Sequence, residues 1–162
     1  MDMIAWDDNL STGVDELDGD HRQLIDCYNM LSGEFIAGCR AAEINRLLAL
    51  LVEHTEGHFR REEALMDQAR YPKSASHREE HRALLQSVTL LQFKAVSATG
   101  NPLSSYTLSF LRSWLVNHIL DADKVLAQFL LRPSAAVIAA EEPLPLSVAI
   151  RAGSSWSETH LL

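Results

Sequence analysis

The chain has 162 residues, of which 47% are hydrophobic, a composition that fits one folded domain and excludes wholesale disorder. The first 20 residues hold seven acids and neither Lys nor Arg, whereas the remaining residues carry 15 acids and 14 bases. A nearly neutral body without a basic stripe excludes nucleic acid and an anionic membrane surface as natural partners.

The first 17 residues are expected to form an extended arm that contains Trp6 and lies across the rest of the domain. A helix should follow, with Asp18 or Asp20 as its N-cap and Gly38 as its end. Its apolar stripe recurs every three or four residues, which is helical periodicity, and consists of Leu24, Tyr28, Leu31 and Phe35.

Three more helices are predicted by the same spacing. The second runs from about Ala42 to about Ala69, where the Tyr71-Pro72 stretch breaks it. The third begins near Ser74 and ends before Gly100, and the fourth runs from about Ser104 to Leu131. Four long helices with short connections predict an all-α, antiparallel up-down-up-down four-helix bundle.

The composition shifts after the fourth helix, at Pro133. We therefore expect residues 1–132 to form the bundle with its arm, and residues 133–162 to form an irregular C-terminal extension that could dock a protein partner. Neither a secretory signal nor a membrane span is visible, which predicts a cytoplasmic location. The cysteines, Cys27 and Cys39, are interpreted as reduced packing residues.

The histidines carry the strongest functional signal, because every predicted helix supplies at least one. His58 and Glu62 are four residues apart, as are His77 and His81, so each pair shares one helix face. A single imidazole on such a face is usually only hydrogen-bonded. Several imidazoles inside one bundle would cost a few kcal/mol each unless a metal ion binds them.

The spaced residues resemble the signature of the hemerythrins, in particular their bacterial single-domain form. The similarity covers roughly residues 3 to 131 and includes the segments LDGDH, HFRREEALM, HREEH and WLVNHILDAD. It implies a non-haem di-iron centre of two oxo- or hydroxo-bridged iron ions inside the bundle. The implied ligands are His21, His58, Glu62, His77, His81, His118 and Asp123.

In the implied arrangement one iron has three histidines (His77, His81 and His118), the other has His21 and His58, and both carboxylates bridge. This set leaves one coordination position free, on the iron with two histidines. The resemblance therefore implies reversible dioxygen binding for carriage, storage or delivery. Apolar neighbours are expected to exclude water from the ligand: Phe59, Leu115 and Ile119.

Two other functions compete with this interpretation. The same centre could sense oxygen and act on a partner through the arm or residues 133–162. It could also serve a di-iron oxidase or peroxidase, but ferritin-like enzymes use Glu-x-x-His pairs, which this sequence lacks. We therefore predict a binding protein and not an enzyme.

Helical geometry alone favours Asp121 over Asp123 as the carboxylate beside His118, because position i+5 lies about 140° around an α-helix. The family pattern favours Asp123, which would need a local widening of the helix. His54 is interpreted as a boundary residue and His160 as solvated. The neighbouring charged residues are interpreted as surface charge: Arg60, Arg61 and Glu63.

Overall fold

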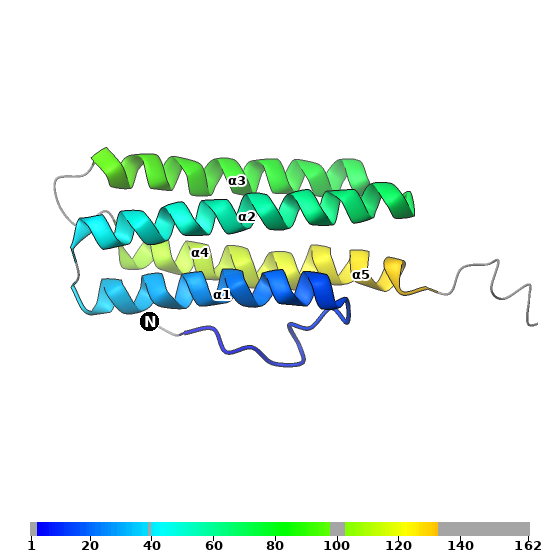
Figure 1. The fold of residues 1–162 in the computed structure, drawn as a ribbon, viewed down its shortest axis with the longest axis horizontal. Helices are drawn as coiled ribbons and strands as arrows, with labels where there is room; N and C mark the ends of the chain where they lie inside the picture. Colours follow the sequence, from blue (N-terminus) through cyan, green and yellow to red (C-terminus); the bar gives the residue numbers. More distant parts are fainter. Residues whose placement is uncertain (1–2, 39, 98–102, 133–162) are drawn as a thin grey trace, which may run out of the picture. The chain divides into compact units, whose positions relative to one another are not determined.

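The computed structural model describes residues 3–38, 40–97 and 103–132, and all regular elements among them are helices. These are α1 (Asp15–Ile36), α2 (Ala41–Ala69), α3 (Ser74–Ser97), α4 (Ser105–His118), a π-helical turn (Ile119–Asp123) and α5 (Lys124–Leu130). The last three follow one another without interruption from residue 105 to residue 130. Together they form one continuous helical segment, called the fourth rod here, of an antiparallel four-helix bundle (Figure 1). The predicted all-α four-helix bundle is thus confirmed.

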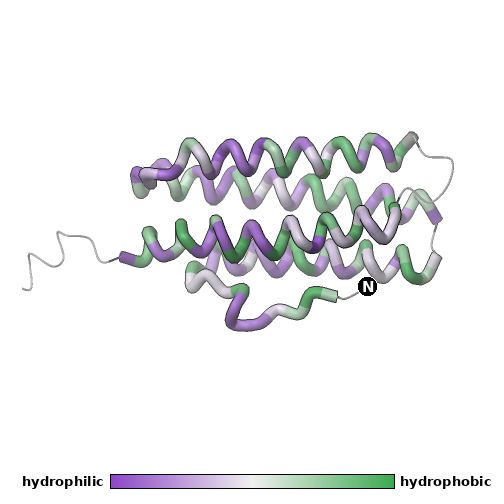
Figure 2. The backbone as a smooth tube through the Cα atoms, turned by 180° about the vertical axis from the view of Figure 1, so that it is seen from behind, coloured by the Kyte–Doolittle hydropathy of each residue, from purple (hydrophilic) through white to green (hydrophobic). Residues whose placement is uncertain are grey.

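Each helix buries an apolar stripe in a shared core, and hydrophobic positions recur along every helix between hydrophilic ones (Figure 2). The predicted stripe of α1 is confirmed, since Leu24, Tyr28 and Leu31 are buried and Phe35 packs against them. The C-terminal half of α1 and the N-terminal half of α2 both contribute several buried residues to this core, and α4 contributes others. In an antiparallel bundle these two halves lie at the same end.

The start of α1 differs from the prediction. The helix begins at Asp15 after Val14, whose backbone is extended, so the expectation that Asp18 or Asp20 is the N-cap is wrong. Asp18 is already inside the helix, where its carboxylate accepts hydrogen bonds from the Ser11 hydroxyl at 2.6 Å and the Thr12 amide at 2.7 Å. Asp18 therefore holds the arm against the first turn of α1.

The arm before α1 has no helix and lies alongside it (Figure 1). Asn29 fixes it by accepting a hydrogen bond from the Ile4 amide at 2.8 Å and donating one to the Ile4 carbonyl at 2.9 Å. The guanidinium of Arg22 lies 4.2 Å from the centre of the Trp6 ring. These contacts stabilise the extended conformation that the sequence predicts.

The ends of the other helices agree closely with the predicted ones. Arg70 has a left-handed backbone with φ 52°, which ends α2 just before Tyr71. Ser104 caps α4 by accepting a hydrogen bond from the Thr107 amide at 3.1 Å. The predicted fourth helix differs in one respect, because a π-helical turn interrupts its α-helical geometry.

Residues Met1–Leu131 form one compact unit. The predicted extension, residues 133–162, lies outside the described residues, as do Cys39 and His160. Cys27 is buried in the core, in keeping with a packing role. None of the helices in the described part of the chain is both long and apolar enough to cross a membrane.

Candidate metal centre

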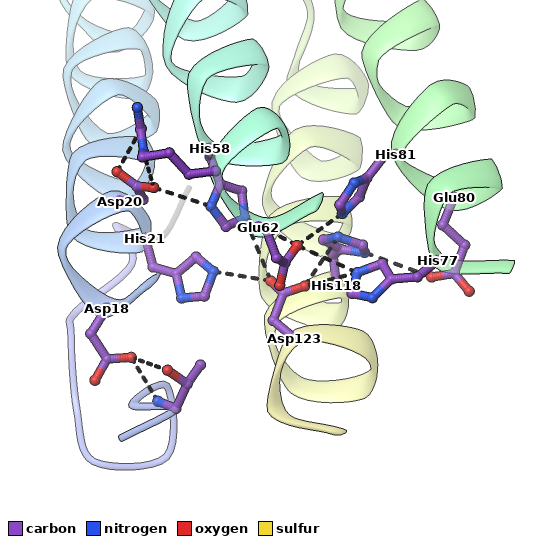
Figure 3. A network of polar contacts seen from close by, with 12 residues as sticks. Asp18, Asp20, His21, His58, Glu62, His77, Glu80, His81, His118 and Asp123 are labelled. Atoms are coloured by element: carbon purple, nitrogen blue, oxygen red, sulfur yellow. Dashed lines mark hydrogen bonds and ion pairs between the residues drawn. The ribbon is translucent and has the colours of Figure 1, made fainter. Parts of the chain in front are cut away.

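The antiparallel topology brings the start of α1, the end of α2, the start of α3 and the end of the fourth rod to one end of the bundle (Figure 1). Those segments carry the histidines and acids singled out above. Figure 3 shows the side chains directed toward one another from all four rods. All of them are at most 9% exposed: His21, His58, Glu62, His77, His81, His118 and Asp123.

The side chains form two adjoining groups, each able to hold a metal ion. In the first, Asp123 Oδ1 lies 3.2 Å from Nε2 of both His77 and His118, and Glu62 Oε2 lies 3.0 Å from Nε2 of His81. In the second, Asp123 Oδ2 lies 3.0 Å from His21 Nε2 and 3.9 Å from His58 Nε2.

The two carboxylates lie between the groups. Asp123 directs one oxygen to each group, and Glu62 Oε2 is 3.5 Å from His77 Nε2 and 3.9 Å from His58 Nε2. Carboxylates in this position are suited to bridging two metal ions. All five imidazoles direct Nε2 toward these two carboxylates.

The hydrogen bonding of the cluster is incomplete without a metal. The inward Nε2 atoms and all four carboxylate oxygens are buried and lack hydrogen-bond partners, although several lie at ion-pair distance from each other. An unsatisfied buried polar group costs about 1 to 3 kcal/mol. Coordination to metal ions would offset that cost for every one of these atoms, so the donor set fits a di-iron centre.

Burial and mutual charge set the protonation of the cluster. Burial and the nearby Asp123 charge raise the pKa of Glu62 to about 8. Burial opposes the ionisation of Asp123, but contacts with His21 and His58 outweigh it and place its pKa well below the usual value. Burial lowers the pKa of His118 to about 3, which keeps this imidazole neutral, the form that binds metals.

The π-helical turn explains how Asp123 reaches the centre. The Lys124 amide donates to the Ile119 carbonyl, five residues earlier, so the helix is locally wider than an α-helix. Asp123 is fully buried in the cluster, whereas Asp121 is exposed. The widening expected from the family pattern is therefore present, and the α-helical argument for Asp121 does not apply here.

Three further carboxylates contact the outer nitrogens of the cluster histidines. Glu63 Oε1 is 3.0 Å from Nδ1 of His81, Asp20 Oδ2 is 3.5 Å from Nδ1 of His58, and Glu80 Oε2 is 3.7 Å from Nδ1 of His118. Such partners orient an imidazole and raise its affinity for metal. None of these three acids is among the site residues predicted from the sequence.

Arginines pair with two of these three outer acids. Arg61 donates to both oxygens of Asp20 at 2.7 and 2.8 Å, and Arg78 lies 3.2 Å from Glu63. The interpretation of Glu63 as plain surface charge is wrong, because Glu63 is partly buried and contacts a cluster histidine. Arg61 is exposed, as expected, but it pairs with Asp20. Arg60 is exposed, as expected.

Of the predicted apolar neighbours, Phe59 contacts the rings of three cluster histidines. Phe59 stacks on His81 with ring centroids 3.8 Å apart, and it lies 5.5 Å from the His58 ring and 5.7 Å from the His118 ring. Leu115 and Ile119 are buried in the same cluster of core residues. His54 is only partly buried and belongs to neither metal-binding group, in agreement with a boundary position.

A four-helix bundle that gathers imidazoles and two central carboxylates at one end defines a protein with a buried, histidine-rich dinuclear metal site. Residues 12–130 match the family model described as the hemerythrin HHE cation binding domain. The chain belongs to the hemerythrin family.

Similar proteins span most of the chain. It is 32% identical over 127 residues to a bacteriohemerythrin of Stenotrophomonas maltophilia, covering 78% of this chain and 81% of that protein. It is 30% identical to myohemerythrin-1 of Phascolopsis gouldii, covering 74% and 87% of the two chains. A crystal structure of wild-type hemerythrin superimposes with a TM-score of 0.72 at 30% identity, covering 80% of this chain and 98% of that one.

Proposed function

We propose that the protein binds dioxygen reversibly at a di-iron centre, for carriage, storage or delivery. The observation that carries this proposal is the buried cluster of five imidazoles and two central carboxylates. When bound, a ferrous pair supplies the electrons that dioxygen takes up and returns. A cytoplasmic location, as predicted from the sequence, is part of the proposal.

Each ligand has a proposed role that its position supports. His77, His81 and His118 would hold one iron, since their Nε2 atoms belong to the first group. His21 and His58 would hold the other iron, which then retains a free coordination position. Glu62 and Asp123 would bridge the two irons, because both carboxylates face both groups.

The surroundings favour binding over turnover. Phe59 contacts the cluster histidines, and Phe59, Leu115 and Ile119 are buried apolar residues that would exclude water from bound oxygen. The donor set has more imidazoles than carboxylates, unlike the ferritin-like di-iron enzymes, in which Glu residues dominate. We therefore propose a carrier that is not an enzyme.

Metal analysis combined with absorption spectra under argon and air tests this function. We expect about two irons per chain and a visible band in air that disappears when oxygen is removed. A zinc-filled site, or a spectrum that never reverts under argon, would contradict the proposal.

The ligand assignment has its own test. His77→Ala and Glu62→Ala should each lower the iron content, because each removes a donor from the first group. His54→Ala is the matched control, since His54 lies on α2 near the cluster but outside both groups. Full iron content and unchanged spectra in the first two variants would refute the assignment.

A further inference from the structure

Two hollows open on the face between α3 and the fourth rod, beside the first metal-binding group. One has a volume of about 420 Å³ and includes His77 in its lining, and the other has about 320 Å³ and includes His118. Glu80 and Asp121 line both hollows. The two acids therefore stand where two cluster histidines are closest to solvent.

A series of side chains that can bind a metal ion leads from this face to the centre. The Glu80 side chain is 57% exposed, and its Oε2 lies 3.7 Å from Nδ1 of His118. Nε2 of the same imidazole lies 3.2 Å from Asp123 Oδ1 (Figure 3). Nε2 of His77 and of His118 are buried and lack hydrogen-bond partners, which independently indicates a ligand at the inner end of this line.

A third hollow that reaches the cluster lacks this excess of acids. A hollow of about 520 Å³ between α2 and α3 reaches His81, and its lining contains three arginines (Arg60, Arg78 and Arg82) against two glutamates. The hollows beside Glu80 and Asp121 contain one cation, Lys73. Arg78 is paired with Glu63 and Asp67, and Arg82 with Glu79. A divalent cation is therefore attracted more strongly to the face with Glu80 and Asp121.

We propose that Glu80 and Asp121 form the entry site through which ferrous ions reach the centre, with His77 and His118 as the first ligands met inside. This inference rests on the proposed function, since it assumes that the cluster takes up iron. Both acids would raise the local ferrous concentration at the surface. Asp121 would not be needed to hold the iron afterwards, whereas Glu80 also contacts the outer nitrogen of His118.

The test is the rate of ferrous uptake by metal-free protein under argon, followed by the loss of colour of a ferrous chelator. Removing one unit charge near a divalent ion should slow uptake about fivefold at low salt in Asp121→Asn. Asp121→Asn combined with Glu80→Gln should slow it at least tenfold. Raising the salt to about 0.5 M should bring the uptake rates of both variants close to that of the parent protein, because salt screens the attraction between the acids and the ferrous ion.

Asp26→Asn is the matched control, because it removes the same charge from an exposed position on α1. Its uptake rate should stay close to that of the parent protein, and both Asp26→Asn and Asp121→Asn should reach the final iron content of the parent protein. Unchanged uptake in Asp121→Asn, or equal slowing in the control, would overturn the entry site. Several-fold faster uptake in Arg60→Gln would place the entry between α2 and α3 instead.

The two proposals fail in different ways. If the parent protein takes up no iron, the proposed function fails and the entry site fails with it. If it takes up two irons per chain at a rate insensitive to both acids, only the entry site is wrong.

Discussion

Asp20 provides the sharpest test of the outer carboxylates. It is 8% exposed, its carboxylate lies 3.5 Å from Nδ1 of His58, and it accepts two hydrogen bonds from Arg61. Burial raises the pKa of Asp20, but His58 and Arg61 outweigh it and lower the pKa to about 2. Asp20→Asn keeps the shape of the side chain and removes its charge.

Two losses of different size are expected. The pair with Arg61 is partly exposed and contributes about 1 kcal/mol to the free energy of unfolding, with or without metal. Losing the outer partner of a ligating histidine weakens metal affinity about 10- to 100-fold. That factor corresponds to about 1.4 to 2.7 kcal/mol, which appears only in the metal-loaded protein. Asp20→Asn should therefore cost about 1 kcal/mol without iron and about 2.5 to 4 kcal/mol with it.

Urea unfolding of metal-free and iron-loaded protein measures both quantities, and a chelator titration measures the affinity directly. Arg61→Gln is the control, because it breaks the same ion pair but leaves the Asp20 carboxylate beside His58. It should cost about 1 kcal/mol in both states. Equal loss of iron affinity in Asp20→Asn and Arg61→Gln would refute the orienting role of Asp20.

Three other predictions concern the arm, the apolar shell and the extension. Asp18→Asn should destabilise the protein by about 1 to 3 kcal/mol. Burial raises the pKa of Asp18, but the hydrogen bonds from Ser11 and Thr12 outweigh burial and lower it below its usual value. The stability difference between the parent protein and Asp18→Asn should therefore be complete above about pH 4 and disappear as the pH falls through the lowered pKa. Urea unfolding at a series of pH values measures this difference. A difference that persisted at lower pH would contradict this. Phe59→Leu should keep the iron but shorten the lifetime of the oxygenated form, seen as faster loss of its visible band, and an unchanged lifetime would refute the role of Phe59. Deleting residues 133–162 should leave oxygen affinity unchanged, whereas an altered affinity would favour a sensor.

The sequence predicts the bundle well because its signals are local. Helical stripes, the Tyr71-Pro72 break and the cap at Ser104 act within a few residues, and the structure has helix ends close to the predicted ones. The start of α1 was predicted wrongly because Asp18 resembles a cap in sequence but bonds backward to the arm. Whether Asp18 caps the helix or binds the arm depends on tertiary contacts, which the local sequence does not contain.

The centre shows the same division between local and tertiary information. Spacing identifies the pairs His58 with Glu62 and His77 with His81, because both members of each pair share one helix. Spacing alone wrongly favours Asp121 over Asp123, since only a π-helical turn brings position i+5 beside His118. No α-helical periodicity contains that turn, and only the resemblance to a family indicated it.

The outer carboxylates follow a pattern that is visible only across helices. Asp20 precedes the α1 ligand but contacts a histidine of α2, and Glu63 follows the α2 ligand Glu62 but contacts α3. Glu80 precedes the α3 ligand His81 but contacts His118 of α4. Neighbouring residues on a helix point about 100° apart, so an acid beside an inward ligand faces the adjacent helix.

Because an acid on one helix contacts a histidine on the next, the packing of the helices and the orientation of the metal-binding histidines depend on each other. A rotation of α2 or α3 that turned its own ligand away would also withdraw the carboxylate that orients the histidine of the next helix. The series runs from α1 to α4 and does not close, because among the described residues Nδ1 of His21 has no hydrogen-bond partner. Asp18, three residues before His21, ties the arm to the first turn of α1, so the arm is attached to the segment that carries this ligand.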